Sequence, residues 1–95
     1  MRPSVIGVPW FTPKTFERVR LISEDDLPDT FTKWEVRAER NFERLLGIGF
    51  SLEKVVIDTD ELLAFARERH GGTINEIIRH DFAAMLAVRK YGGHS

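Results

Sequence analysis

The sequence predicts an α+β domain, mostly helical, in the order strand-helix-helix-strand-helix-helix with a short two-stranded sheet. Two runs of β-branched residues have the length of short strands. Four longer stretches repeat apolar residues every three or four positions, which is the spacing of a helix that covers a core. Capping residues or a proline precede these stretches, as is usual where helices begin.

The composition indicates one folded unit. With 95 residues, 42% hydrophobic and 31% charged, we expect a single globular domain over residues 1–91 and a flexible C-terminal tail at 92–95. The formal net charge of -1 gives the chain no general attraction to nucleic acid or to an anionic membrane. No stretch approaches the roughly 18 apolar residues of a membrane span. The lack of cysteine suits a reducing compartment, and we expect a cytoplasmic protein. No cofactor and no metal are expected.

The first strand and helix follow from two prolines. The β-branched run at 5–8 predicts a brief strand that ends at Pro9, since proline lacks the backbone donor. Thr12 is the expected N-cap of the first helix, with Pro13 at its first position and its end near Ser23.

An acidic connector at 23–29 separates the first helix from the second. Pro28 disfavours a helix at the residue before it, so the second helix is expected to begin at about Asp29 or Thr30. It should end at Leu46, where Gly47 is placed to adopt the left-handed C-terminal conformation and Ile48 to supply an apolar contact.

The second half repeats the order of strand and two helices. The run at 55–57 predicts a strand buried on both faces, and Asp58 with Glu61 has the spacing of a capping box for a helix that ends near His70. Thr73 with Glu76 repeats that spacing. The last helix should turn these residues toward the core: Ile74, Ile77, Ile78, Phe82, Met85 and Leu86. The two strands either pair with each other or pair across a dimer.

A set of aromatic, apolar and proline positions resembles a small bacterial protein family of uncharacterised function. The positions are Pro9-Trp10-Phe11, Leu27-Pro28, Trp34, Val55-Val56-Ile57-Asp58 before Leu63 and Phe65, and Arg79 with Phe82. The resemblance spans nearly the whole chain. It implies a fold and no particular activity.

The second helix sorts its side chains by chemistry. Apolar residues lie along one face, acidic residues along another, and Lys33, Arg37, Arg40 and Arg44 along a third. Like charges one turn apart cost an isolated helix about 0.2–0.5 kcal/mol per pair, so at least one row should face a complementary group. The first helix, the acidic connector, a partner protein, a second subunit and nucleic-acid phosphates are the alternatives, with nucleic acid the least favoured.

Trp10 and Phe11 follow Pro9 outside regular structure. They either form an exposed anchor for a partner or close one end of the core. The acidic run Asp25, Asp26 and Asp29 superficially matches a metal-binding pattern, but Pro28 interrupts its spacing, and a solvated loop is the better interpretation.

Arg79 and Asp81 are the candidates for buried charge. Asp81 falls inside the apolar arc predicted for the last helix, where a carboxylate needs an arginine from another helix or a shifted pKa. The three histidines show no metal-ligand spacing, and no serine or threonine has a recognisable nucleophile setting. No catalytic or metal-binding residue is therefore assigned.

These patterns favour a protein-interaction or regulatory module, either a homodimer or the binder of a partner protein. The first alternative is a small enzyme whose pocket combines dispersed residues such as Asp81, Arg79 and Trp10. The second alternative is a nucleic-acid-binding accessory protein that uses the basic row of the second helix.

Overall fold

The two strands and four helices follow each other in the predicted order. The computed structural model describes residues 5–91, except for the side chain of Tyr91, so the predicted tail at 92–95 lies outside the described residues. The elements are β1 (Val5–Trp10), α1 (Pro13–Ile22), α2 (Phe31–Ile48), β2 (Ser51–Val56), α3 (Thr59–Arg69) and α4 (Glu76–Tyr91). The α+β, mostly helical fold class is confirmed.

β1 and β2 pair with each other as parallel strands. The register runs from Val5 opposite Ser51 to Trp10 opposite Val56. One further backbone bond extends the ladder, because the Ile57 N–H donates to the Trp10 carbonyl at 3.0 Å. Of the two predicted alternatives, pairing within the chain is therefore the one that the fold uses.

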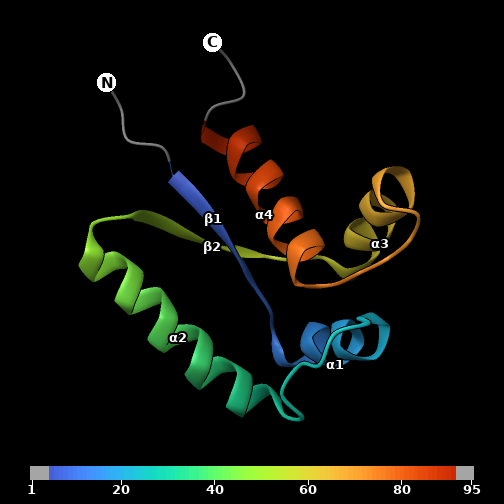
Figure 1. Ribbon diagram of the computed structural model, residues 1–95, viewed down its shortest axis with the longest axis horizontal. Coiled ribbons are helices and arrows are strands. Elements are labelled where there is room, and N and C mark those ends of the chain that lie inside the picture. Colours follow the sequence, from blue (N-terminus) through green and yellow to red (C-terminus); the bar gives the residue numbers. More distant parts are fainter. Residues whose placement is uncertain (1–4, 92–95) are drawn as a thin grey trace.

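The strand pair lies between α2 and α4, which cover opposite faces (Figure 1). A Cβ atom on Gly7 would meet the Ala83 carbonyl oxygen of α4 at 2.4 Å, so only glycine allows α4 to pack this closely on β1. Trp10 is an odd number of residues away and therefore leaves the other face. There its ring packs edge-on against Trp34 of α2, with centroids 5.1 Å apart.

Aromatic side chains form the part of the core around α1 and α2. Trp34 contacts the rings of Trp10, Phe11, Phe16 and Phe31, with centroids between 4.9 and 5.8 Å apart. The rest of the core comes from the second half of the chain and includes Ile57, Leu62, Phe65, Ala66, Ile74, Ile78, Phe82 and Ala83. Burial of these large rings is the main source of stability in such a small domain.

The helix ends agree with the prediction except at two places, the end of α2 and the start of α4. The Thr12 hydroxyl accepts the Thr15 N–H at the start of α1, and the Asp58 carboxylate accepts the Glu61 N–H at the start of α3, as predicted. The predicted cap at Gly47 is wrong, because α2 continues through Gly47 to Ile48 and the left-handed residue is Gly49, with φ of 115°.

The start of α4 also differs from the prediction. The helix begins at Glu76, and the Asn75 side chain accepts the Ile78 N–H at 3.0 Å, so Asn75 rather than Thr73 caps it. Asparagine satisfies an unpaired N-terminal donor as well as threonine does.

Both strands are longer than their β-branched runs. β1 continues through Pro9 to Trp10, because the proline sits where its backbone nitrogen faces away from β2. β2 begins four residues before Val55, at Ser51. The prediction that it is buried on both faces is wrong, since Val56 is 59% exposed.

Candidate functional site

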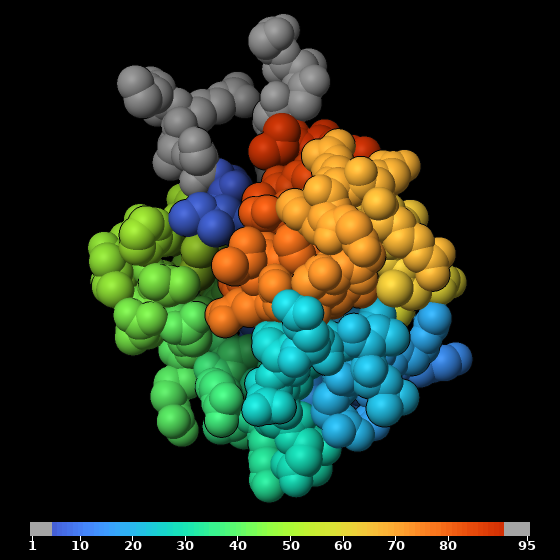
Figure 2. Space-filling view, turned by 45° about the vertical axis from the view of Figure 1, so that its right-hand side comes forward, coloured from blue at the N-terminus to red at the C-terminus, as the bar shows by residue number. Residues whose placement is uncertain are grey.

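A groove of about 380 Å³ opens between α2, the N-terminal half of α4 and the connector that joins α1 to α2. Figure 2 shows the hollow where these three segments meet. We call it the α2–α4 groove. Its lining comprises Val8, Pro9 and Phe11, the connector residues Asp25, Asp26, Leu27 and Pro28, Trp34, Arg37, Ala38 and Asn41 of α2, and Glu76, Arg79 and His80 of α4.

The groove follows the outer edge of β1. Val8 and Pro9 are neighbours in the strand and point to opposite faces, yet both line the groove. Because the Trp10 carbonyl accepts the N–H of Ile57, the residue after β2, alternation along the strand directs the Pro9 backbone outward, away from β2. Pro9 has no N–H to offer there, so this stretch of the edge is protected against the addition of another strand.

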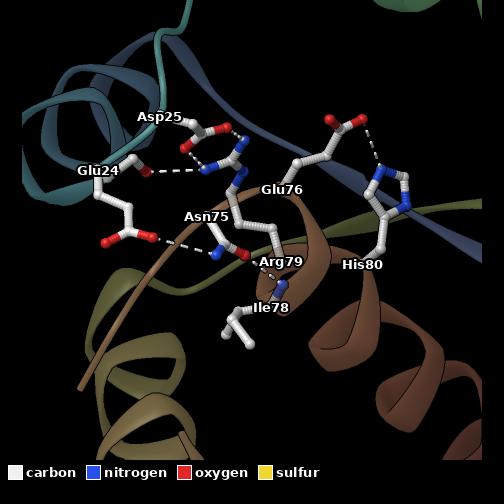
Figure 3. Close-up of polar contacts among 8 residues, drawn as sticks. Glu24, Asp25, Asn75, Glu76, Ile78, Arg79 and His80 are labelled. Atoms are coloured by element: carbon white, nitrogen blue, oxygen red, sulfur yellow. Dashed lines mark hydrogen bonds and ion pairs between the residues drawn. The ribbon is translucent and has the colours of Figure 1, made fainter. Parts of the chain in front are cut away.

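An ion pair between Arg79 and Asp25 forms part of the lining of the groove (Figure 3). Arg79 donates from Nη1 to Asp25 Oδ1 at 2.9 Å and from Nη2 to Asp25 Oδ2 at 2.8 Å, and Nη1 also donates to Ser23 Oγ at 2.9 Å. The Arg79 side chain is 5% exposed and that of Asp25 is 31% exposed. The hydrogen bond from Arg79 lowers the pKa of Asp25, so the carboxylate stays ionised and the pair fastens the connector to α4.

The prediction of a buried charge is thus correct for Arg79 and wrong for Asp81. Asp81 is exposed and lines a shallow depression between α3 and α4, together with Arg69 and His70. The apolar arc predicted for α4 was placed too far around the helix axis. The same error explains why Ile77, which that arc placed in the core, is 69% exposed. The buried face is centred on Arg79, Phe82 and Ala83.

Trp10 and Phe11 close the core and are not an exposed anchor. They are 8% and 4% exposed. The ammonium of Lys54 lies 4.4 Å from the centroid of the Trp10 ring, which is the geometry of a cation–π contact. Within the described residues, Arg79 lines the α2–α4 groove and Asp81 lines the depression between α3 and α4. Trp10 lines neither of the two.

The basic row of α2 is exposed, and its members have different neighbours. Lys33 forms an ion pair with Asp29 at 3.0 Å, and Arg44 donates to Asn41 Oδ1 at 2.7 Å. Only Arg37 lines the groove, and within the described residues no hydrogen bond or ion pair joins its side chain or that of Arg40.

Complementary groups reach α2 from two segments. The connector supplies Asp29 to Lys33, as one of the sequence alternatives proposed. β2 supplies a cation to the acidic row of α2, because Lys54 forms an ion pair with Glu39. Among the ion pairs of the described residues, α1 supplies none to α2, since Arg18 pairs with Asp60 of α3 and Arg20 pairs with Glu17 of α1 itself.

The sequence interpretation missed the connector as part of a site. Asp25 was placed in a solvated loop, whereas it binds Arg79 from a helix 54 residues further along the chain. A signal was available in the sequence, because six of the aromatic, apolar, proline and arginine positions noted there line the groove. They are Pro9, Phe11, Leu27, Pro28, Trp34 and Arg79.

Comparison of the chain with protein-family models, with curated proteins and with solved structures finds no match. Within the described part of the chain, no helix combines the length and apolar character needed to cross a bilayer.

Proposed function

We propose that this chain is a protein-interaction module that binds its partner in the α2–α4 groove. The observation that carries the proposal is the contrast between the two arginines of the groove. Arg79 is buried and neutralised by Asp25, whereas Arg37 lies at the surface without an ion-pair partner in the described residues. The half-buried side chains of Leu27, Pro28 and Ala38 also line the groove, and an apolar group of a partner can cover them.

The chemistry of the same groove argues against a catalytic role. A general base works best when its pKa lies near the working pH, and the contact with Arg79 moves the pKa of Asp25 in the opposite direction. The remaining titratable pair, His80 and Glu76, is one turn apart on the exposed side of α4 at 3.9 Å. Neither arrangement activates a nucleophile.

The charge pattern of α2 argues against a nucleic-acid partner. Phosphate binding needs a continuous row of available cations, and in this row Lys33 is occupied by Asp29. Exposed Glu35 and Glu43 lie on the same helix and would repel phosphates. A partner that reaches past Arg37 into an apolar groove is a better match to this surface.

Selection of peptides tests the proposal. A dodecapeptide library displayed on phage is enriched on the intact chain, and the affinities of the selected peptides are measured by calorimetry. Asn41→Trp places a bulky ring in the groove from an exposed position and should weaken binding about tenfold or more, whereas the matched variant Arg40→Trp on the same helix should not. Melting temperatures of both variants confirm that each is folded.

Two outcomes would contradict an interaction role for the groove. One is that no peptide is enriched, and the other is that Asn41→Trp binds the selected peptides as well as Arg40→Trp does. Fluorescence anisotropy with single-stranded and double-stranded 20-nucleotide probes completes the comparison. Tight binding that Arg40→Gln abolishes would favour the nucleic-acid alternative instead.

A further inference from the structure

The outer edge of β2, on the side away from β1, presents unpaired backbone groups. Ile57, directly after β2, points its N–H inward to the Trp10 carbonyl. Alternation along the strand therefore directs the N–H and C=O groups of Leu52, Lys54 and Val56 outward. No hydrogen bond among the described residues reaches these outward groups. β2 packs on β1, α2 and α4 and on no other described helix or strand, and we call this surface the β2 edge.

The two edges of the strand pair differ in their protection. Pro9 removes an N–H from the outer edge of β1, whereas β2 contains no proline. A lysine on an edge strand can keep other strands away. The ammonium of Lys54, however, lies 4.4 Å from the centroid of the Trp10 ring and forms an ion pair with Glu39 of α2, so it is held on one face of the sheet. Val56 adds an apolar side chain that is 59% exposed.

The α2 side of the β2 edge has a surplus of negative charge. Glu39 contacts β2 through Lys54, and Glu35 and Glu43 lie one helical turn before and after it, on the same side of α2. Glu35 and Glu43 are exposed and form no ion pair within the described residues. Arg37 leaves the helix on the other side, where it lines the groove. Lys54 is paired with one of the three carboxylates, so two negative charges remain beside this edge.

These carboxylates follow β2 in antiparallel order. Trp34 packs on Trp10, and Trp10 is the residue opposite Val56. Glu35, next to Trp34, therefore lies toward the end of β2, and Glu43 lies toward its start. Four residues of a helix rise about 6 Å, and alternate residues of a strand are about 6.6 Å apart. Alternate side chains of a third strand would thus have nearly the same spacing as the carboxylates.

We propose that the β2 edge accepts an extended segment of a partner protein as a third strand, with basic side chains directed at Glu35 and Glu43. Backbone hydrogen bonds hold the segment, and the acidic row selects its charge. The segment carries lysine or arginine opposite Leu52 and Val56 and an uncharged residue opposite Lys54. This inference goes beyond the proposed function, because the β2 edge and the groove lie on opposite edges of the strand pair.

A second copy of this chain fits the same edge less well. Joining two β2 edges around a two-fold axis places both α2 helices on the same face of the joined sheet. The two acidic rows would then approach each other, which like charges oppose, whereas a basic segment neutralises the row. On the opposite face, Glu53 is paired with Lys90 at 2.9 Å, so Glu53 does not alter this choice.

Two peptides test the selection of charge by nuclear magnetic resonance titration of the intact chain. The basic peptide is acetyl-Thr-Lys-Val-Thr-Val-Lys-Thr-amide, and the acidic peptide replaces both lysines by glutamate. Each sequence is a palindrome, so the charges face the same carboxylates in either strand direction. We expect the basic peptide to bind about tenfold or more tightly, with the largest shifts at the amide signals of Leu52, Lys54 and Val56. N-methylation of its central threonine and the following valine removes a required donor in either direction and should abolish binding.

Two pairs of variants test the residues of the chain. Glu35→Gln/Glu43→Gln should bring the ratio of affinities close to one. The matched control Glu17→Gln/Glu68→Gln removes the same charge from α1 and α3, which do not pack on β2, and should keep the ratio. Val56→Pro removes an outward N–H without breaking a bond to β1 and should weaken the basic peptide, whereas Val56→Thr should not. Melting temperatures identify the variants that fold, and the N-methylated peptide tests the same bonds on the unaltered chain.

The inference is overturned if neither peptide binds, if both bind equally, if the N-methylated peptide binds as well as the basic one, or if Glu35→Gln/Glu43→Gln keeps the preference. Shifts confined to the groove residues Arg37 and Asn41 would also overturn it. So would a dimer in light scattering that Val56→Pro converts to a monomer, because a second copy would then occupy the β2 edge. The proposed function is decided separately, by whether Asn41→Trp blocks the peptides selected from the library.

Discussion

The unequal burial of Arg79 and Asp25 predicts that the two ways of breaking their ion pair have unequal costs. Asp25→Asn leaves a guanidinium that is 5% exposed without its counter-charge, whereas Arg79→Met leaves a carboxylate that is 31% exposed. An uncompensated charge inside a protein costs about 3–5 kcal/mol, and access to water recovers part of that cost. We therefore expect the free energy of unfolding to fall by about 3 kcal/mol in Asp25→Asn and by about half as much in Arg79→Met.

Thermal and urea denaturation at neutral pH measure this difference. In a domain of this size, 1 kcal/mol corresponds to about 4–8 °C, so Asp25→Asn should lower the melting temperature by about 12–24 °C. The double variant Asp25→Asn/Arg79→Met should be more stable than Asp25→Asn alone, because the buried cation is gone. Equal losses in the two single variants, a larger loss in Arg79→Met, or a double variant less stable than Asp25→Asn would refute the reasoning.

Three further predictions follow from the packing and the charges. Gly7→Ala should lower the free energy of unfolding by about 1–3 kcal/mol, because its Cβ would meet the Ala83 carbonyl oxygen at 2.4 Å. Gly47→Ala should raise it by about 0.5–1 kcal/mol, since Gly47 lies inside α2 with no atom within 4 Å of an added Cβ, and the opposite order in urea denaturation would contradict the placement of both glycines. The pKa of Asp25 is lowered in the folded chain, so the pair contributes fully above the ordinary value of 3.8 and loses its contribution as the pH falls toward the folded value. The stability difference between the wild-type chain and Arg79→Met should therefore shrink below about pH 4, and a constant difference down to acid pH would count against this assignment.

The elements could be predicted from the sequence because their signals are local. Thr12 with Pro13 marks the start of α1, and Asp58 marks the start of α3, through bonds that span three residues. Local signals did not decide whether Gly47 or Gly49 ends α2, because both follow a helical stretch and either can adopt a left-handed conformation. The start of β2 was missed because residues 51–54 are mostly polar and show no run of β-branched residues.

The candidate site could be predicted only in part. Arg79 was singled out correctly as a buried charge, whereas the interaction role expected of Arg37 stays a prediction. Their neighbours in the groove come from the connector, β1 and the opposite helix, and no helical or strand period relates those segments. The rotation of α4 was the decisive error. Ile78 and Phe82 are compatible with either side of the arc, and only the close approach of Ala83 to Gly7 fixes which side faces inward.

The parallel pairing of β1 with β2 affects how the chain reaches its native state. β1 must pair with β2, Ser51–Val56, which follows it in the chain only after α1 and α2. Ala83 of α4 then packs on one face of β1, against Gly7. Bringing two strands together across so long a segment of chain loses conformational entropy before the contacts between them form, and this slows folding. During synthesis on the ribosome, the earliest segment therefore stays without its neighbours until nearly the whole polypeptide has emerged, and a fragment ending before α4 would leave it uncovered.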